Sequence, residues 1–131
     1  INSKGKKIAN RKAKNKIYFK DLIKSCDIGL STVILDLMFI KKNNLYFPSK
    51  IRTKEDYILW LDIIRKIKVI RGIDLKLTNY RKTNNSLSSN ILLNLLNGYR
   101  VYRNYMNYSI ILSFYSLFHL SINYLKKISK K

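Results

Sequence analysis

The feature that most constrains this chain is a pair of adjacent acidic residues, Glu55 and Asp56, at the start of a strongly apolar helical pattern. Apolar residues behind the pair recur with the spacing of one helix face, which predicts a half-buried helix over residues 53–67. Thr53 is the expected N-cap, which would put Asp56 at the third helical position of a capping box. Asp56 also stands four residues before Trp60, so we expect it on the covered face.

The acidic pair has two interpretations. A carboxylate that is held and partly desolvated at a helix N-terminus suits a general base. Acidic residues are also favoured in the first turn of any helix, because they complement the helix dipole and satisfy free N–H groups. This stretch alone does not separate catalysis from capping.

The charge balance limits the partners. In 131 residues the chain carries 27 basic and 7 acidic residues, a formal net charge of +20, which favours anionic partners such as nucleic acid, acidic lipid head groups or phosphorylated substrates. A bias toward Lys, Ile, Asn and Tyr from A/T-rich coding would give the same charge without a binding face.

The length fits one small domain or part of a larger one. Because the chain opens on Ile1, without an initiator Met or a signal segment, we expect a longer protein.

The chemistry-bearing residues outside the acidic pair are few. The single Cys26 cannot form an internal disulfide, which fits a reducing cytoplasm. His119 stands in an apolar run and is expected to pack rather than to bind a metal. No Cys, His or acidic cluster has metal-ligand spacing, so we predict no metal-binding residue in this chain.

The first half of the chain predicts several short elements. We expect helical turns over 20–24, a turn at Gly29, a buried strand over 30–36 and a short helix over 37–42. Ser31 and Thr32 stand near the start of that strand, where their hydroxyls could line a ligand cleft or simply satisfy the turn backbone.

The second half predicts strands at 68–70 and 75–80 and helices from residue 88 to the end. Arg81 leaves the second strand, where it could bind an anion through two parallel hydrogen bonds or remain a surface side chain. Leucines and tyrosines form an apolar stripe in the first of the C-terminal helices, flanked by Arg100 and Arg103.

The last helical segment carries a narrow polar line within an apolar sequence: Ser109, Ser113, Ser116, Asn123 and Lys127. Residues 108–125 approach the length of a membrane span, but their polar residues favour a helix that lies on the bilayer surface. Packing against the rest of the chain is the competing interpretation.

Several motifs together resemble the C-terminal half of a bacterial family 2 glycosyltransferase. In order along the chain these are Gly29-Leu30-Ser31-Thr32-Val33, Phe47-Pro48, Arg52-Thr53-Lys54-Glu55-Asp56-Tyr57-Ile58-Leu59-Trp60-Leu61, and Tyr80-Arg81 with Ser86-Leu87-Ser88. The resemblance implies an α/β fold: the acceptor-binding half of a GT-A (Rossmann-like α/β/α) domain over 1–87, followed by a C-terminal extension of amphipathic helices over 88–131, for which membrane contact and packing on the domain are the two interpretations given above. The implied activity is inverting transfer of a sugar from a nucleotide-diphosphate donor to an acceptor hydroxyl, in cell-surface polysaccharide or lipopolysaccharide biosynthesis.

The resemblance also implies roles for individual residues. Asp56 is similar in role to the base that deprotonates the acceptor hydroxyl, and Glu55 would shape the site or contact the acceptor. Arg81 would sit near the departing diphosphate, where positive charge offsets the charge that develops. Ser31, Thr32 and Trp60 would bind substrate.

The chain departs from the family in its metal motif. The family implies a divalent metal, Mg or Mn, held by an Asp-x-Asp motif, and no such motif occurs here. We therefore expect a fragment without the nucleotide-binding half, inactive by itself, from an enzyme on the cytoplasmic face of the cell membrane. Its expected partners are a nucleotide-sugar donor, a glycan or lipid-linked acceptor and an anionic membrane surface.

The rival hypothesis is a small basic protein that binds nucleic acid or anionic membrane without catalysis. The interleaved Tyr and Arg residues of 99–108 favour it, since they could stack on bases or sit at lipid head groups. We do not expect nucleic acid as a partner, because the basic residues are spread along the chain and no helix-turn-helix, zinc or RNP-type pattern appears.

Overall fold

The structure is a computed structural model that describes residues 1–49, 51, 53–81 and 90–129, with side chains as far as residue 126. Strand β1 (Lys16–Tyr18) leads into helix α1 (Phe19–Lys24), a 3-10 turn η1 (Leu30–Thr32) and helix α2 (Leu37–Lys42). Helix α3 (Glu55–Ile67) then leads into β2 (Val69–Arg71). The C-terminal part holds α4 (Ile91–Arg100), the π-helical turn η3 (Val101–Tyr105) and α5 (Ile110–Ser129).

The described chain is a mixed α/β protein that consists mostly of helices. Its sheet has two strands, β1 and β2, paired antiparallel with Ile17 opposite Ile70. The prediction of an α/β protein is confirmed at this level, and the GT-A architecture stays a prediction. Of the predicted strands, 68–70 is confirmed as β2, and its partner is the short run at Lys16–Tyr18.

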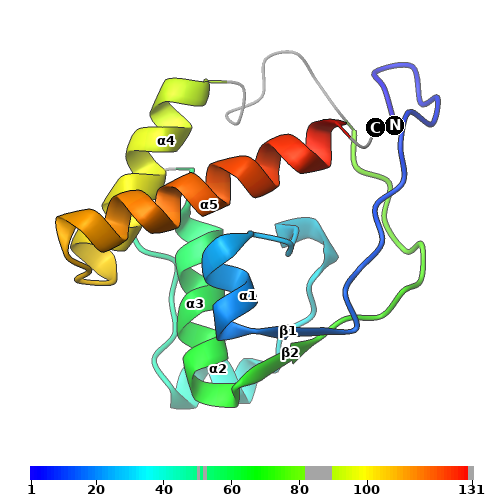
Figure 1. Cartoon of the computed structure of the whole chain (residues 1–131). Coiled ribbons are helices and arrows are strands. Elements are labelled where there is room, and N and C mark those ends of the chain that lie inside the picture. Colours follow the sequence, from blue (N-terminus) through cyan, green and yellow to red (C-terminus); the bar gives the residue numbers. More distant parts are fainter. Residues whose placement is uncertain (50, 52, 82–89, 130–131) are drawn as a thin grey trace.

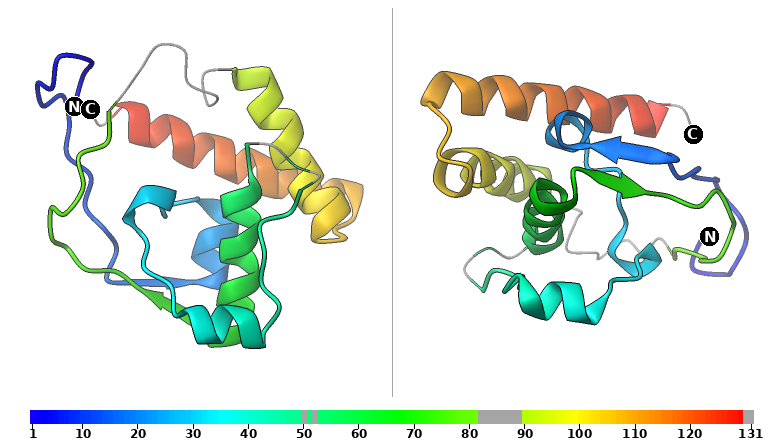
Figure 2. Two further views of the ribbon diagram at one scale, coloured as in Figure 1. Left: turned by 180° about the vertical axis from the view of Figure 1, so that it is seen from behind. Right: turned by 90° about the horizontal axis from the view of Figure 1, so that it is seen from below.

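Helix α3 runs through the middle of the molecule (Figure 1). Seen from below, α5 lies along one edge and α2 at the opposite edge, with α1, the strands and α3 between them (Figure 2). α3 supplies most of the core, because nearly every residue from Tyr57 to Ile64 is buried. Val101, Tyr102 and Met106 complete the core from the other side of position 88, so residues of both proposed domains share it. The boundary between 87 and 88 stays a prediction.

Two tyrosine hydroxyls hold the end of α1 in this core. Those of Tyr57 and Tyr102 lie 3.0 Å apart. Tyr57 donates to the carbonyl of Leu22 at 3.0 Å, and Tyr102 donates to that of Ile23 at 2.6 Å. The last carbonyls of a helix lack their usual helical partners, and these hydroxyls supply donors to two of them, in addition to the Ser25 N–H that reaches the Leu22 carbonyl at 3.2 Å.

The prediction of a buried strand over 30–36 is wrong. Leu30–Thr32 forms the 3-10 turn, closed by a hydrogen bond from the Thr32 N–H to the Gly29 carbonyl at 2.9 Å. Ile34 is 98% exposed. β-branched residues favour a strand only where a neighbouring strand and a covered face are available, and the described chain offers this run neither.

The predicted strand over 75–80 is also absent from the described chain, where these residues are exposed and the Leu77 N–H donates back to the Leu75 carbonyl at 3.1 Å. The predicted helices are confirmed: 20–24 as α1, 37–42 as α2 and 53–67 as α3. In the region predicted to be helical from residue 88 on, the described residues 90–129 form α4, η3 and α5, and Asn107, at a φ of 55°, stands in the break before α5. Within the described chain, none of the helices combines the length and apolar character needed to cross a membrane.

The start of α3 differs from the predicted capping box. Lys54, not Thr53, is the N-cap, so Glu55 and Asp56 are the first and second helical residues. Thr53 has a left-handed backbone with φ of 83°, and its hydroxyl accepts a hydrogen bond from Asn97 Nδ2 at 2.9 Å. The Thr53 backbone therefore does not have the extended conformation of an N-cap residue, and its hydroxyl contacts α4 instead. Two motif segments, Arg52 and residues 86–88, fall outside the described residues.

Candidate active site

Asp56 lies half-buried in the first turn of α3. Its Oδ1 accepts a hydrogen bond from the backbone N–H of Tyr57 at 2.7 Å. Burial raises the pKa of the Asp56 carboxyl above its ordinary value; the Tyr57 N–H partly offsets this effect and the charge of Glu55 adds to it. A raised pKa makes the carboxylate a stronger base, which is the direction that general-base catalysis needs.

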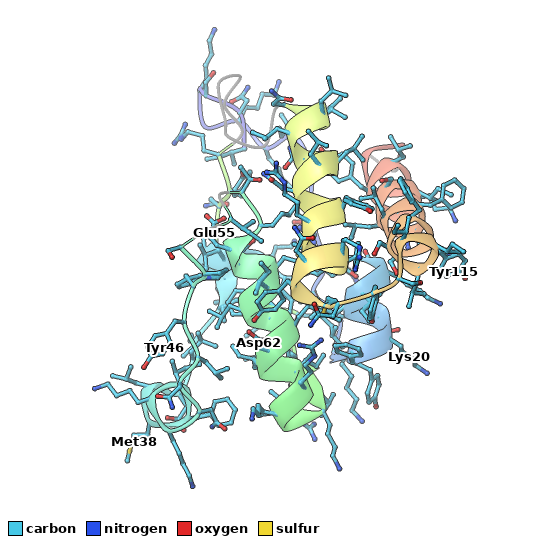
Figure 3. All side chains as sticks on the ribbon, turned by 90° about the vertical axis from the view of Figure 1, so that its left-hand side faces the viewer. Lys20, Met38, Tyr46, Glu55, Asp62 and Tyr115 are labelled. Carbon is cyan, nitrogen blue, oxygen red and sulfur yellow. The ribbon has the colours of Figure 1, made fainter. Side chains whose placement is uncertain are left out.

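Glu55 precedes Asp56 at the N-terminal end of α3 (Figure 3). Its Oε2 is buried and has no hydrogen-bond partner among the described residues. A buried carboxylate oxygen without a partner destabilises the protein unless a donor reaches it. A hydroxyl group of a ligand is a donor of the right kind.

Trp60 lies one turn after Asp56 on the same helix. Its ring is in the core, 2% exposed, and its indole N–H is also buried without a partner in the described part of the chain. Glu55, Asp56 and Trp60 therefore all lie in the first two turns of α3, but the Trp60 ring is buried in the core. Its assignment as a substrate-binding residue stays a prediction.

The other three predicted site residues make different contacts. Arg81 donates to the carbonyls of Asn2 at 3.2 Å and Ser3 at 2.6 Å, so its guanidinium holds the N-terminal segment. Ser31 is exposed, and the exposed Thr32 donates from its hydroxyl to the Gly29 carbonyl at 2.7 Å. The Thr32 hydroxyl therefore satisfies a backbone carbonyl of its own turn, which was the alternative to lining a ligand cleft. Among the described residues, Arg81, Ser31 and Thr32 make no hydrogen bond with Asp56.

The sequence analysis did not identify a hydrogen-bonded contact between α4 and the residues just before the acidic pair. Asn97 of α4 donates to the Thr53 hydroxyl, two residues before Glu55, and its Oδ1 accepts from Arg100 Nη1 at 3.2 Å. This chain of contacts fixes α4 against the start of α3. The sequence signal was available but weak, since Asn97 stands opposite the leucine stripe of its helix.

The divalent metal implied by the resemblance does not fit the side chains described here. Within residues 1–49, 51, 53–81 and 90–126, no group of three or more His, Cys, Asp or Glu side chains could hold a metal ion. Glu55 and Asp56 form a pair without a third ligand. We therefore derive no step through a metal.

Curated relatives of the chain are bacterial glycosyltransferases. The chain is 42% identical over 74 residues to the UDP-Glc:alpha-D-GlcNAc-diphosphoundecaprenol beta-1,3-glucosyltransferase WfaP of Escherichia coli. It is 37% identical over 79 residues to the enzyme of the same description, WfgD, also of Escherichia coli. The putative teichuronic acid biosynthesis glycosyltransferase TuaG of Bacillus subtilis (strain 168) is 33% identical over 78 residues.

These matches cover 56–60% of this chain but only 28–30% of the length of the relatives. No protein-family profile matches the chain, and no solved structure matches it significantly. The resemblance to bacterial glycosyltransferases indicated by the motifs is thus confirmed, and the similarity is consistent with a piece of a family 2 enzyme.

Proposed function

We propose that this chain is the acceptor-side part of an inverting glycosyltransferase of family 2. The enzyme would transfer a sugar from a nucleotide-diphosphate donor to a hydroxyl of a lipid-diphosphate-linked glycan, during assembly of a cell-surface polysaccharide. The descriptions of two relatives, WfaP and WfgD, support these partners, because both name UDP-Glc and GlcNAc-diphosphoundecaprenol. A lipid-linked acceptor is a membrane component, so the proposed location is the inner face of the cell membrane.

The observation that carries the proposal is the half-buried Asp56 at the N-terminus of α3, with its pKa raised by burial. In the proposed step, the Asp56 carboxylate takes the proton from the acceptor hydroxyl as that oxygen attacks the anomeric carbon. The new bond joins this carbon to the acceptor oxygen, and the bond to the donor diphosphate breaks. Attack from the side opposite the leaving group inverts the anomeric configuration.

The neighbouring groups have supporting roles in this proposal. The buried Oε2 of Glu55 would accept a hydrogen bond from a second hydroxyl of the acceptor and so orient it. Arg81 would offset charge on the departing diphosphate, which requires it to exchange its contacts with Asn2 and Ser3 for the donor. Ser31, Thr32 and Trp60 stay proposed substrate contacts. A divalent metal stays a proposal for residues other than those described here.

The proposal is tested by analysing the product. The complete enzyme is incubated with a panel of UDP-sugars and a synthetic GlcNAc-diphospho-lipid, and the new linkage is identified by nuclear magnetic resonance. A product of opposite anomeric configuration to the donor is expected. Retention of configuration would contradict a single displacement with Asp56 as base, and the absence of a product with every donor would contradict the proposed substrates.

A further inference from the structure

Helix α5 packs inward with small polar residues and with Leu117 and Leu120, and it leaves its most apolar side outward. Ser113 and Ser116 are buried, and Asn123 donates to the Lys24 carbonyl at the end of α1 at 2.9 Å. The opposite side of the helix carries large, exposed apolar residues: Ile111, Phe114, Tyr115, Phe118 and Leu125. Ser113, Ser116 and Asn123 of the predicted polar line therefore face the protein, whereas Ser109 is exposed, and the apolar side is exposed in the described chain.

Helix α4 shows the same reversal. Its buried residues are Asn97, which binds Thr53, and Gly98. A Cβ on Gly98 would lie 2.9 Å from the Leu117 side chain, so α4 and α5 approach each other closely at this point. The leucine stripe of α4 faces outward, with Leu92, Leu95 and Leu96 exposed.

The two apolar sides join into one surface. Tyr99 stands in the middle of the α4 stripe, and its ring lies 5.0 Å from that of Phe114 on α5. We call the joined residues the α4–α5 apolar surface: Leu92, Leu95, Leu96 and Tyr99 of α4, and Ile111, Phe114, Tyr115, Phe118 and Leu125 of α5. A contiguous apolar surface of this kind on a soluble protein marks a binding site.

The charges of this part of the chain indicate what binds there. After Asp74 the sequence contains no acidic residue, while 88–131 contains six basic ones: Arg100, Arg103, Lys126, Lys127, Lys130 and Lys131. Lys20 of α1 adds a cation on the same side of the molecule, since it and Tyr115 project to one side in Figure 3 while Met38 projects to the other. Lys14, Lys24 and Lys126 line a hollow beside α5 together with Asp21 and Asp27, so the hollow itself carries both signs of charge.

We propose that the α4–α5 apolar surface lies on an anionic lipid bilayer, with its apolar residues in the acyl boundary and its basic residues among the head-group phosphates. Helices with Phe and Leu on one side and Lys and Arg nearby bind such interfaces without spanning them. A second copy of the chain suits the surface less well, because its own basic residues would be brought together. The surface adds to the proposed function a means of reaching a lipid-linked acceptor, but the binding itself does not depend on that function.

The test is binding of the full chain to vesicles of phosphatidylcholine, with or without phosphatidylglycerol. We expect binding to the anionic vesicles, and we expect the double variant Ile111→Ser, Phe118→Ser to bind them at least about tenfold more weakly through lost apolar burial. The control is Ile34→Ser, Met38→Ser, since Ile34 is more exposed than Ile111 and Met38 is more exposed than Phe118, but both lie away from α4 and α5. Its affinity should match that of the unaltered chain.

Each other outcome overturns the inference. Equal weakening by the control pair would show that general surface hydrophobicity drives binding. Unchanged binding by the Ile111, Phe118 variant would show that charge alone attracts the chain to lipid. The chain could instead fail to bind vesicles and form a dimer in light scattering. If the Ile111, Phe118 variant dissociated that dimer, the surface would be assigned to a second copy of the chain. Asp56→Asn keeps its vesicle binding whether or not the proposed catalysis is correct, so the two failures are distinguishable.

Discussion

Tyr57 and Tyr102 connect three elements through their hydroxyls, because each reaches a terminal carbonyl of α1 from α3 or η3. Replacing Tyr57 with Phe leaves the Leu22 carbonyl buried without this donor. We expect a loss of about 1–2 kcal/mol in the free energy of unfolding, measured by urea titration. The matched control is Tyr124→Phe, since Tyr124 is exposed and its hydroxyl makes no hydrogen bond with the described residues; an equal loss there would contradict the network.

The same tyrosines predict a decline of stability at alkaline pH. Burial, the main cause, raises the pKa of both Tyr57 and Tyr102. Burial and the hydrogen bond to Asp62 raise the pKa of Tyr105 to about 12. Tyrosines in the unfolded chain lose their protons at about pH 10. Above this pH the unfolded state therefore binds fewer protons than the folded state, and the free energy of unfolding falls. Tyr57→Phe should make the fall less steep between about pH 9 and 11, and an unchanged slope would contradict the burial of this hydroxyl.

The ionised carboxylate of Asp56 that the proposed catalysis needs should lower the stability of the folded state. Because its pKa is raised in the folded state, ionising it disfavours folding, and the free energy of unfolding decreases as the pH rises from about 4 through the raised pKa. Asp56→Asn removes this effect and can still accept the Tyr57 N–H. We expect the variant to be more stable than the unaltered chain above that pKa and to lose the advantage at acid pH. Urea titrations across this range test the sign, and an advantage that grows toward acid pH would contradict the burial.

At the scale of elements, the β1–β2 pair depends on one glycine. A Cβ on Gly72 would lie 2.3 Å from the Lys14 carbonyl oxygen, a backbone atom, and the Gly72 N–H donates to the Asn15 carbonyl at 3.1 Å. Gly72→Ala should therefore push the strand ends apart and cost about 1–3 kcal/mol of stability. Gly29→Ala is the control, because its Cβ would make an ordinary contact with Thr32 at 3.5 Å. Equal stability of the two variants would contradict the close approach at Gly72.

The helices could be predicted from the sequence because their signals are local. α2 follows Asp36, which caps it through Oδ1, and the periodicity behind Asp56 gave α3. The strand at 30–36 could not be judged locally, since a strand depends on a neighbour that the apolar run does not encode. The predicted cap at Thr53 was wrong for a similar reason, because its left-handed backbone and its contact with Asn97, distant in sequence, leave no local signal.

The candidate site was only partly predictable. Glu55 and Asp56 are adjacent in sequence, so their shared position at a helix start followed from the pattern. The contacts of Arg81 with Asn2 and Ser3 join opposite ends of the first 81 residues and leave no local signal. The polar line of α5 was visible in the sequence, but the side that it faces depends on the position of α1.

At the scale of the whole molecule, the net charge of +20 must oppose compaction. The described ion pairs involve only Asp27, Asp62 and Asp74, so most basic side chains have no acidic partner that the structure describes. We expect the melting temperature to rise as sodium chloride is increased from about 10 to 150 mM, because the Debye length shortens to about 8 Å. Sucrose at equal osmolarity is the control, and an equal rise in sucrose would show that screening is not the cause.

The most direct test of the account is the rate of sugar transfer by Asp56→Asn in the complete enzyme. Loss of the general base should slow transfer by about 10²–10⁴-fold while leaving donor binding intact. Asp74→Asn, which removes an exposed carboxylate paired only with Lys12 in the described chain, should transfer at the normal rate. Retention of most of the activity by Asp56→Asn would contradict the assignment of Asp56 as the base.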